Sequence, residues 1–369
     1  MRPRATIFIP ACAALFPVCF AAAQTPAPEQ LFHDAVAAQQ RGDDATAIRD
    51  YRELLRQQPG VFQARANLGV ILARQGQFDE AIEQYQAALA GHESNSALRF
   101  NLAMAYYKKG AFTEAAAQLE TLHRADLADA RISMLLGDCY GHLGQPDQAL
   151  ELLGPLETAN PNDLAVASAL APLLIATGHL REGMERYVKL GRLGKSAKAY
   201  VLAGQTALKL SLFEDARDYA DAAIALDAHE PGAYTLRGMA LPLIGDNDGA
   251  VEALNKALAA DANDFEAHFT LGKVLRTNGD LAGARVHLER AMQLRPDSAV
   301  AIYEMARVER SEGKLEDAVR DFERVVHLNP TWAQPHVELS ALYFRLNRQA
   351  DGEREKSEYD RLNVLPGQP

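Results

Sequence analysis

The sequence has few of the residue types on which several protein classes depend. Its 369 residues include three cysteines, one tryptophan, 17 prolines and 25 glycines, and no low-complexity tract. Three cysteines cannot form a disulfide framework, and the spread of Gly and Pro argues against a collagen-like or wholly disordered chain. Lys and Arg number 38 against 49 Asp and Glu, a formal net charge of -11, which disfavours nonspecific nucleic-acid binding. The composition is that of a soluble protein, long enough for two average domains or one repeat array.

The first 23 residues have the layout of a secretory signal peptide. Arg2 and Arg4 precede an apolar stretch, residues 5–20, and three alanines, residues 21–23, stand before Gln24. A basic start, an apolar middle and small residues at the end are typical of export followed by cleavage. We therefore expect 1–23 to be removed and the protein to be periplasmic or secreted in a bacterium.

Two alternatives to this interpretation involve the membrane. As a transmembrane helix the stretch is short and contains Pro10 and Pro17, and no other segment offers the ~20 apolar residues that a span needs. A lipoprotein would need a cysteine directly after small residues, and Ile9-Pro10-Ala11 before Cys12 fits poorly. Membrane association is thus expected only through a complex or, as the weaker alternative, through a lipid anchor at Cys12.

A period of 34 residues runs through the rest of the chain. Glycine recurs at this spacing at positions 42, 76, 110, 144 and 178, and again at 245, 279 and 313. Ser211 and Asn347 occupy the two remaining positions, with one step of 33 residues before Ser211. Seven residues before each of these positions stands a small residue, and five residues after it stands Ala or Gly. Such self-similarity indicates a repeat architecture.

The repeated unit is predicted to be a pair of helices. Apolar residues recur at spacings of three and four, the helical period, and the Gly between them ends the first helix because it adopts the left-handed conformation without steric cost. Small residues beside the turn allow the two helices to cross closely, and prolines at the repeat boundary end the second helix. One hairpin cannot bury its apolar face alone, so the hairpins must stack. The boundary prolines are Pro59, Pro161, Pro296 and Pro330.

These columns resemble the tetratricopeptide repeat (TPR) family over nearly all of residues 28–362. The residues that carry the resemblance include Asn67-Leu68-Gly69 with Gly76, Ala81, Tyr85 and Ala88, and Leu271-Gly272 with Gly279, Ala284, Leu288, Ala291 and Pro296. The resemblance implies an all-α fold, a right-handed α-solenoid of about nine to ten hairpins with a C-terminal capping helix. It also implies a concave groove lined by the first helices. It implies no particular ligand, since family members mostly bind different proteins or peptides.

Departures from the period predict the domain organisation. We expect an N-terminal TPR block of about five repeats over 28–190, a linker or register break over 191–196, and a C-terminal block over 197–362. The C-terminal block should hold about four repeats and a capping hairpin, with a tail over 363–369. Prolines 155, 172 and 242 fall within expected helices, where each should cost or kink a hydrogen bond. Glu353 and Lys356 suit a solvated capping helix.

The first-helix positions of the eighth and ninth repeats predict a basic, aromatic-flanked binding site. Lys273 and Arg276 are three residues apart, as are Arg307 and Arg310, so each pair lies on one helix face. Such a cluster could hold a carboxylate or an acidic peptide. The alternative is a solvated face neutralised by nearby glutamates. The predicted site comprises Phe269, Lys273, Arg276, Tyr303, Arg307 and Arg310, with Arg345 on the following helix and Glu304, Glu309 and Glu312 as the neutralising glutamates.

A second candidate lies toward the N-terminus. Asn67 and Asn101 share one column and resemble the backbone-binding asparagines of some TPR grooves. The ladder stops at Leu135, and Ala66 and Ala97 stand where known carboxylate clamps have lysine, so binding of chaperone tails is not expected. Phe32, Phe100, Met104 and Met134 either form an apolar groove on the same surface or pack against neighbouring helices.

No catalytic constellation emerges from the sequence. Gly194-Lys195-Ser196 lacks the upstream glycine and strand of a phosphate-binding loop, and the ten histidines show no paired metal-ligand spacing. Cys139 falls in a column of small apolar residues, which predicts a core position. The repeats also leave no room for a separate catalytic domain. We therefore predict no enzyme activity, no metal and no cofactor.

Together these observations predict a noncatalytic exported scaffold that binds a protein or peptide partner in the concave groove of a TPR superhelix. The alternative is a structural accessory subunit of a cell-envelope assembly, such as a secretion, pilus or outer-membrane complex. The two differ because a subunit stays in a large complex, whereas a scaffold exchanges its partner.

Overall fold

A computed structural model describes residues 26–363, and every regular element in that range is helical. It contains twenty α-helices and one short 3-10 helix, η1, and the described residues form no strand. The predicted all-α solenoid is therefore confirmed. The predicted signal peptide and residues 364–369 of the predicted tail lie outside the described residues, and Asn363 is the last residue of the final helix.

The chain divides into two compact units after Asp126. The helices of the first unit are α1 (Pro28–Gln40), α2 (Asp44–Gln57), α3 (Phe62–Arg74), α4 (Phe78–Leu89), α5 (Ser96–Lys109) and α6 (Phe112–Ala125). Those of the second unit are α7 (Ala130–His142), α8 (Pro146–Ala159), α9 (Leu164–Ala176), α10 (Leu180–Gly194), α11 (Ala197–Lys209), α12 (Phe213–Leu226), α13 (Ala233–Ala240), η1 (Leu241–Ile244), α14 (Asn247–Ala260), α15 (Phe265–Thr277), α16 (Leu281–Leu294), α17 (Ala299–Ser311), α18 (Leu315–Leu328), α19 (Ala333–Arg345) and α20 (Gln349–Asn363).

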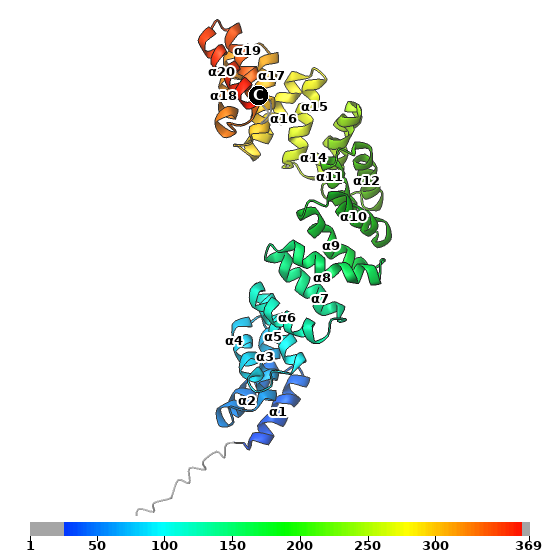
Figure 1. Ribbon diagram of the computed structural model, residues 1–369, viewed down its shortest axis with the longest axis vertical. Coiled ribbons are helices and arrows are strands. Elements are labelled where there is room, and N and C mark those ends of the chain that lie inside the picture. Colours follow the sequence, from blue (N-terminus) through cyan, green and yellow to red (C-terminus); the bar gives the residue numbers. More distant parts are fainter. Residues whose placement is uncertain (1–25, 364–369) are drawn as a thin grey trace, which may run out of the picture. The chain divides into compact units, whose positions relative to one another are not determined.

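Within each unit an odd-numbered helix packs against the even-numbered helix that follows it (Figure 1). Odd-numbered helices of successive hairpins also contact each other, α3 with α5 in the first unit and α7 with α9 in the second. The same holds for α11 with α13, α13 with α15, and α15 with α17. The first helices of these successive hairpins therefore lie side by side, and we call the surface of the odd-numbered helices in each unit the odd-helix face.

The turns inside the hairpins have the predicted left-handed backbone. The eight marker glycines have φ between 69° and 87°, and Ser211 and Asn347, which replace glycine, have φ of 58° and 59°. Glycine adopts this conformation without steric cost, and asparagine tolerates it better than most other residues. The 34-residue spacing of the glycines is therefore the spacing of the turns.

Small residues bring the two helices of a hairpin close together, as predicted. A Cβ atom placed on Gly69 of α3 would lie 2.7 Å from Cε1 of Tyr85 on α4. One placed on Gly272 of α15 would lie 2.6 Å from Cγ of Leu288 on α16. No real Cβ fits at these distances, so glycine is needed for the large side chain opposite to occupy its place.

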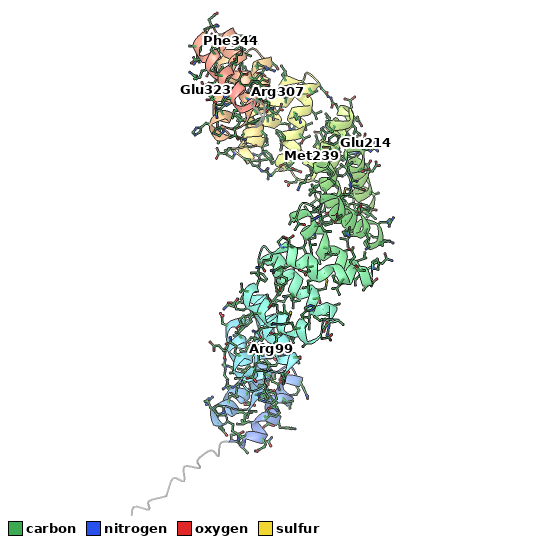
Figure 2. All side chains as sticks on the ribbon, in the orientation of Figure 1. Arg99, Glu214, Met239, Arg307, Glu323 and Phe344 are labelled. Carbon is green, nitrogen blue, oxygen red and sulfur yellow. The ribbon has the colours of Figure 1, made fainter. Side chains whose placement is uncertain are left out.

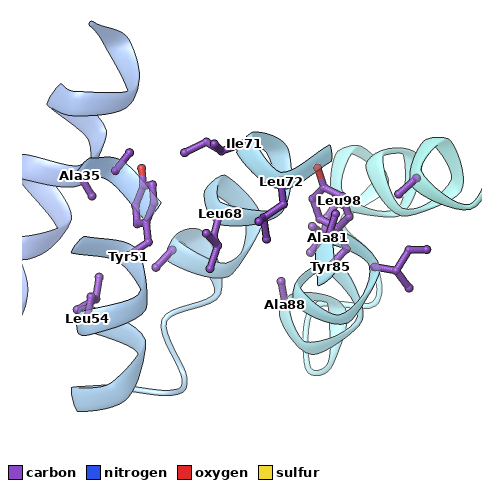
Figure 3. Packing of buried hydrophobic residues seen from close by; sticks show 14 of the residues in the cluster. Ala35, Tyr51, Leu54, Leu68, Ile71, Leu72, Ala81, Tyr85, Ala88 and Leu98 are labelled. Atoms are coloured by element: carbon purple, nitrogen blue, oxygen red, sulfur yellow. The ribbon is translucent and has the colours of Figure 1, made fainter. Parts of the chain in front are cut away.

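The core of the first unit runs along the hairpins between the helices (Figure 3). Tyr51, Leu68 and Leu72 are buried there, and Tyr85 fills the space beside Ala81. Full burial of a large apolar side chain stabilises the fold by about 1.5–3 kcal/mol relative to exposure. These large apolar side chains thus form the core of the first unit.

Helix ends follow the sequence signals. Pro59, Pro161, Pro296 and Pro330 each lie two residues beyond the end of an even-numbered helix. Aspartates cap several helices, as where the side chain of Asp264 accepts a hydrogen bond from the backbone N–H of Ala267.

Of the three prolines predicted inside helices, two lie in α-helices and the third lies in the 3-10 helix. Pro155 and Pro172 lie inside α8 and α9. Pro242 does not lie in an α-helix, because α13 ends at Ala240 and residues 241–244 form η1. A proline has no N–H for the α-helical hydrogen bond, and the tighter 3-10 turn accommodates it.

The predicted link over 191–196 is shorter than expected. Residues 191–194 form the last turn of α10, and only Lys195 and Ser196 stand between α10 and α11. Lys195 is left-handed with φ of 51°, and the hydroxyl of Ser196 caps α11. At the C-terminal end, Glu353 and Lys356 of α20 are exposed, as a capping helix requires.

Candidate partner-binding site

The structure places the predicted C-terminal site on two neighbouring odd-numbered helices. Phe269, Lys273 and Arg276 belong to α15, and Tyr303, Arg307 and Arg310 to α17. Glu304 joins the two helices, because its Oε2 accepts a hydrogen bond from Nε of Arg276 at 3.0 Å and its Oε1 lies 3.2 Å from Nη1 of Arg307. Glu304 is only 6% exposed, and a buried carboxylate requires such partners. Two of the four predicted cations therefore neutralise a buried glutamate.

The other two cations differ from each other. Arg310 forms an ion pair with Glu338 of α19, a residue that the sequence did not single out. Lys273 is exposed and forms no ion pair with any residue of 26–363, and the same is true of Arg345 on α19. Lys273 and Arg345 are thus the predicted cations whose charge remains available to a ligand.

The predicted role of the neighbouring glutamates is corrected in part. Glu304 does neutralise the cluster, but Glu309 and Glu312 do not. Both face Arg285 of α16, which lies 2.6 Å from Glu312 and 3.7 Å from Glu309. They occupy the opposite side of α17 from Arg307 because a helix turns by about 100° per residue.

The predicted aromatic residues pack inside the repeats. The ring of Tyr303 lies 4.6 Å from that of Trp332 and 5.4 Å from that of Phe322, and the guanidinium of Arg307, labelled in Figure 2, lies 5.8 Å from Tyr303. Phe269 stacks on Phe265 with 6.0 Å between ring centroids. Burial raises the pKa of Tyr303, so this phenol stays neutral. Tyr303 packs beside Arg307, and both predicted aromatic side chains are half-buried.

Asn67 has an internal partner in the first unit. Its Nδ2 donates to the hydroxyl of Tyr51 at 3.0 Å, and this hydroxyl donates to Oε1 of Gln39 at 2.8 Å. The three side chains connect α3, α2 and α1. Asn101 occupies the equivalent place on α5 and is half-buried, with no hydrogen bond of its side chain to another residue of 26–363. The two asparagines therefore differ in their hydrogen bonding, and of the two only Asn101 has a side-chain amide that is free to bind a ligand.

The predicted apolar residues of the N-terminal region are half-buried. Phe32 packs on the core with its ring 6.2 Å from Tyr51, which favours the packing interpretation for this residue. Phe100 and Met104 lie on α5. Met134 lies on α7 in the second unit, where it lines a pocket.

This pocket, of about 860 Å³, lies between α7 and α9 on the odd-helix face. Small residues on both helices leave the space between them unfilled: Gly137, Gly141, Ala165, Ser168, Ala169 and Ala176. Leu153 and Leu173 form apolar parts of the lining. We call it the α7–α9 pocket. Its size falls in the range of ligand-binding clefts.

A smaller pocket of about 450 Å³ lies between the next odd-numbered helices, α11 and α13. It is lined by Leu208, Leu236 and Met239, the last of which is labelled in Figure 2. The hydroxyl of Thr235 donates to the carboxylate of Asp264 at its edge. The second unit thus has two unfilled spaces on one face.

Family comparison agrees with this architecture. A model described as tetratricopeptide repeat matches residues 72–139, and another with the same description matches residues 35–97 and 244–299. The chain is a tetratricopeptide repeat protein. No curated protein sequence matches it.

Several solved structures resemble parts of this TPR chain. MamA from Desulfovibrio magneticus RS-1 is 23% identical with a TM-score of 0.42, and the alignment covers 47% of this chain and 97% of MamA. PilF from Pseudomonas aeruginosa is 20% identical with a TM-score of 0.43, and 48% of this chain and 79% of PilF are covered. Yeast Tom70 is 15% identical with a TM-score of 0.44, and the alignment covers 91% of this chain and 85% of Tom70.

TPR proteins generally bind protein partners and generally act as noncatalytic scaffolds.

Among residues 26–363, no group of three or more His, Cys, Asp or Glu side chains could hold a metal ion. Cys139 is buried as predicted, and burial raises the pKa of its thiol to about 11, which keeps it protonated. No helix in the same range is long and apolar enough to span a membrane.

Sequence reasoning missed the α7–α9 pocket and Glu338. The pocket has a signal in the sequence, because glycine and alanine occupy first-helix positions of two successive repeats. Glu338 also has one, since it follows Arg310 by 28 residues, the separation that also joins Arg276 to Glu304. A pair with this separation connects one first helix to the next.

Proposed function

We propose that this TPR protein is a noncatalytic exported scaffold that binds a protein or peptide partner on the odd-helix face, the surface that the family resemblance assigns to the concave groove. The observation that carries the proposal is the α7–α9 pocket. It lies between two first helices, and the residues that line it leave room for the side chains of a partner. Apolar pockets with a few polar groups at the edge are the usual form of binding clefts.

The residues at the rim favour a polypeptide occupant. Ala165, Ser168 and Pro172 of α9 are exposed along one side of the pocket, and Asp138 and His142 of α7 stand on the other. Apolar walls between polar rims suit alternating apolar and polar side chains. The second pocket, between α11 and α13, extends the same face toward the exposed Lys273.

Lys273 and Arg345 support the acidic or carboxylate character of the partner. Both are exposed cations without an internal ion pair, on a chain whose formal net charge is -11. Replacement of both by glutamate should weaken the binding of an acidic partner and reduce its salt dependence. Arg276, Arg307 and Arg310 are unsuitable for this test. Reversal of Arg276 and Arg307 would leave buried Glu304 without a partner, and reversal of Arg310 would remove the partner of Glu338.

The proposal is tested by crosslinking pull-down from the native envelope with two matched variants. Ala165→Trp places a large ring at the pocket rim, and Ala282→Trp makes the same change at an exposed alanine, also the second residue of its helix, on even-numbered α16. We expect the wild type and Ala282→Trp to recover the same partner and Ala165→Trp to lose it. Equal recovery by all three would show that the pocket is not used. A partner that comigrates permanently in a large complex would instead support the accessory-subunit alternative.

A further inference from the structure

A third pocket, of about 380 Å³, lies between the even-numbered helices α16 and α18, over α17. It contains both charged and apolar residues, and it is separate from the pockets of the odd-helix face. Glu309 of α17 and Asp321 of α18 line it together with Arg285 and Arg324. We call it the α16–α18 pocket.

Glu309 is buried there with part of its carboxylate unpaired. The residue is only 8% exposed, and its Oε2 has no hydrogen-bond partner among the described residues. The nearest cation is Arg285, whose Nη1 lies 3.7 Å from Oε1 of Glu309, beyond hydrogen-bond distance. Arg285 donates both of its hydrogen bonds to Glu312 instead. A buried carboxylate oxygen without a donor costs free energy, and a ligand donor would remove that cost.

Asp321 is a second acceptor without a donor. Asp321 is half-buried, and its carboxylate forms no hydrogen bond or ion pair with any residue of 26–363. Arg324, which also lines the pocket, donates to the backbone carbonyl of Pro296 at 2.6 Å. Arg285 and Arg324 therefore donate their hydrogen bonds to other groups, and neither donates one to Glu309 or Asp321. Burial raises the pKa of Glu309 to about 7 and also raises that of Asp321.

The rest of the lining is partly apolar. Met292, Met305 and Pro296 form its apolar part, and Glu289 and Gln293 of α16 add two polar side chains. Methionine adapts its shape to an aliphatic chain. The pocket thus offers an apolar surface for a flexible stem and carboxylate oxygens for a compact cationic head. An ammonium group has three N–H donors and no acceptor, which matches this arrangement.

We infer that the α16–α18 pocket binds a primary alkylammonium group, with the ammonium at Glu309 and Asp321 and the alkyl stem on Met292 and Met305. Such a group is carried either by a lysine side chain of a polypeptide or by a free aliphatic amine. The inference is independent of the proposed partner site, because it concerns a different pocket and different helices.

Titration calorimetry on the full mature chain tests the inference. The probes are Nα-acetyl-L-lysine methylamide, n-butylamine and, as the uncharged control, Nα-acetyl-L-norleucine methylamide. We expect saturable binding of at least one amine and none of the norleucine derivative. Tighter binding of the lysine derivative would identify a polypeptide as the source of the ammonium, and equal or tighter binding of butylamine would identify a free amine. Failure of both amines to bind would overturn the inference.

Two variants separate this site from general charge effects. Glu309→Gln keeps the shape of the side chain and removes its charge, and Glu316→Gln makes the same change at an exposed residue of α18 that does not line the pocket. Loss of a charge-assisted hydrogen bond should weaken amine binding about tenfold or more in Glu309→Gln and leave Glu316→Gln unchanged. Both variants should fold, since neither creates an unpaired charge. Equal affinity of Glu309→Gln and the wild type would contradict the inference.

The pH dependence gives a second readout. An alkylammonium stays protonated up to a pKa of about 10.4, so only the protein titrates near neutrality. Ionised Glu309 is the form that accepts an ammonium, and affinity should therefore rise from pH 6 to pH 8 in the wild type and stay flat in Glu309→Gln. A flat wild-type profile would contradict the assignment of the ammonium to Glu309. The charged groups near Glu309 are Arg285 and Glu289 on α16 and Asp317, Arg320, Asp321 and Arg324 on α18.

Discussion

The turn between the two helices of a hairpin depends on a single residue. Gly76 has φ of 77°, and a Cβ atom there would meet nothing within 4 Å, so backbone conformation and not space determines the residue type. Gly60 provides a comparison, because it is equally open and has no left-handed φ. The two glycines differ only in the conformation that the fold requires of them.

Gly76→Ala should therefore destabilise the protein by about 1 kcal/mol, because alanine in the left-handed region is strained. Gly60→Ala should be neutral or slightly stabilising, since alanine lowers the entropy of the unfolded chain. Urea unfolding followed by circular dichroism measures both. Equal midpoints for the two variants would show that the turn does not need glycine.

Two histidines of the eighth hairpin, His268 and His287, form a hydrogen-bonded pair. Nε2 of His268 donates to the carbonyl oxygen of Ala262 at 3.2 Å, and the two Nδ1 atoms of His268 and His287 lie 3.0 Å apart, so one of them must be unprotonated to accept the hydrogen bond. Burial and the neighbouring His268 lower the pKa of His287. The unfolded state then binds more protons than the folded state below a pH of about 6.5.

Stability should consequently fall as the pH drops below about 6.5, and His287→Gln should reduce this fall. Glutamine can still donate to His268 but does not titrate. The exposed His229 provides the control, and His229→Gln should leave the pH profile unchanged. Thermal unfolding at pH 5.5 and pH 7.5 compares the three proteins, and an unaltered slope in His287→Gln would exclude the pair as its origin.

Part of the candidate site could be predicted at the residue level and part could not. The first-helix columns correctly placed Lys273, Arg276, Arg307 and Arg310 on neighbouring helices. Their partners were harder to predict, because a glutamate on a helix can face either neighbour depending on a rotation of 100° per residue. Glu304 faces Arg276 and Arg307, whereas Glu309 faces Arg285, although both glutamates lie within one helical turn of Arg307.

At the scale of the element, the hairpin is held by the close crossing of its helices. Gly272 faces Leu288, and the carbonyl oxygen of Ala284 would lie 3.2 Å from an added Cβ. Because a backbone atom blocks the space, the helices must separate to admit a larger residue. Gly141 of α7 is also inside a first helix, but its added Cβ would make an ordinary contact of 3.5 Å with Leu173.

Gly272→Ala should thus destabilise the protein by roughly 1–3 kcal/mol through overpacking. Gly141→Ala should be neutral or stabilising by about 0.5–1 kcal/mol, because alanine favours helix more than glycine does. Measurement of the free energy of unfolding of both variants and the wild type tests this prediction. An unchanged free energy in Gly272→Ala would mean that the helices cross less closely than the structure indicates.

The sequence predicts most elements because its signals are local. Turn glycines, boundary prolines and the 3.6-residue pattern locate the helices between them. The exceptions depend on context. The glycines at 191 and 194 suggested a link, but Gly191 faces the ring of Tyr200 at 2.7 Å from its added Cβ, and this close packing keeps α10 regular. The α7–α9 pocket is also a property of two helices and not of one.

At the scale of the whole molecule, the proposal of export depends on the first 23 residues, which lie outside the described range. Cleavage after Ala23 would leave Gln24 as the first residue and remove two arginines. Intact-mass measurement of the protein purified from the envelope fraction of its native cells should give the mass of a chain that begins at Gln24. The mass of the full chain with Met1 would contradict the proposed signal peptide.

The central claim is that a partner binds the odd-helix face. Hydrogen–deuterium exchange of the full chain, with and without the partner recovered by crosslinking, tests it most directly, because exchange reports protection helix by helix. The account predicts slower exchange in α7 and α9, around the α7–α9 pocket, and no change in α10, none of whose residues lines that pocket. Protection confined to the even-numbered helices would contradict it.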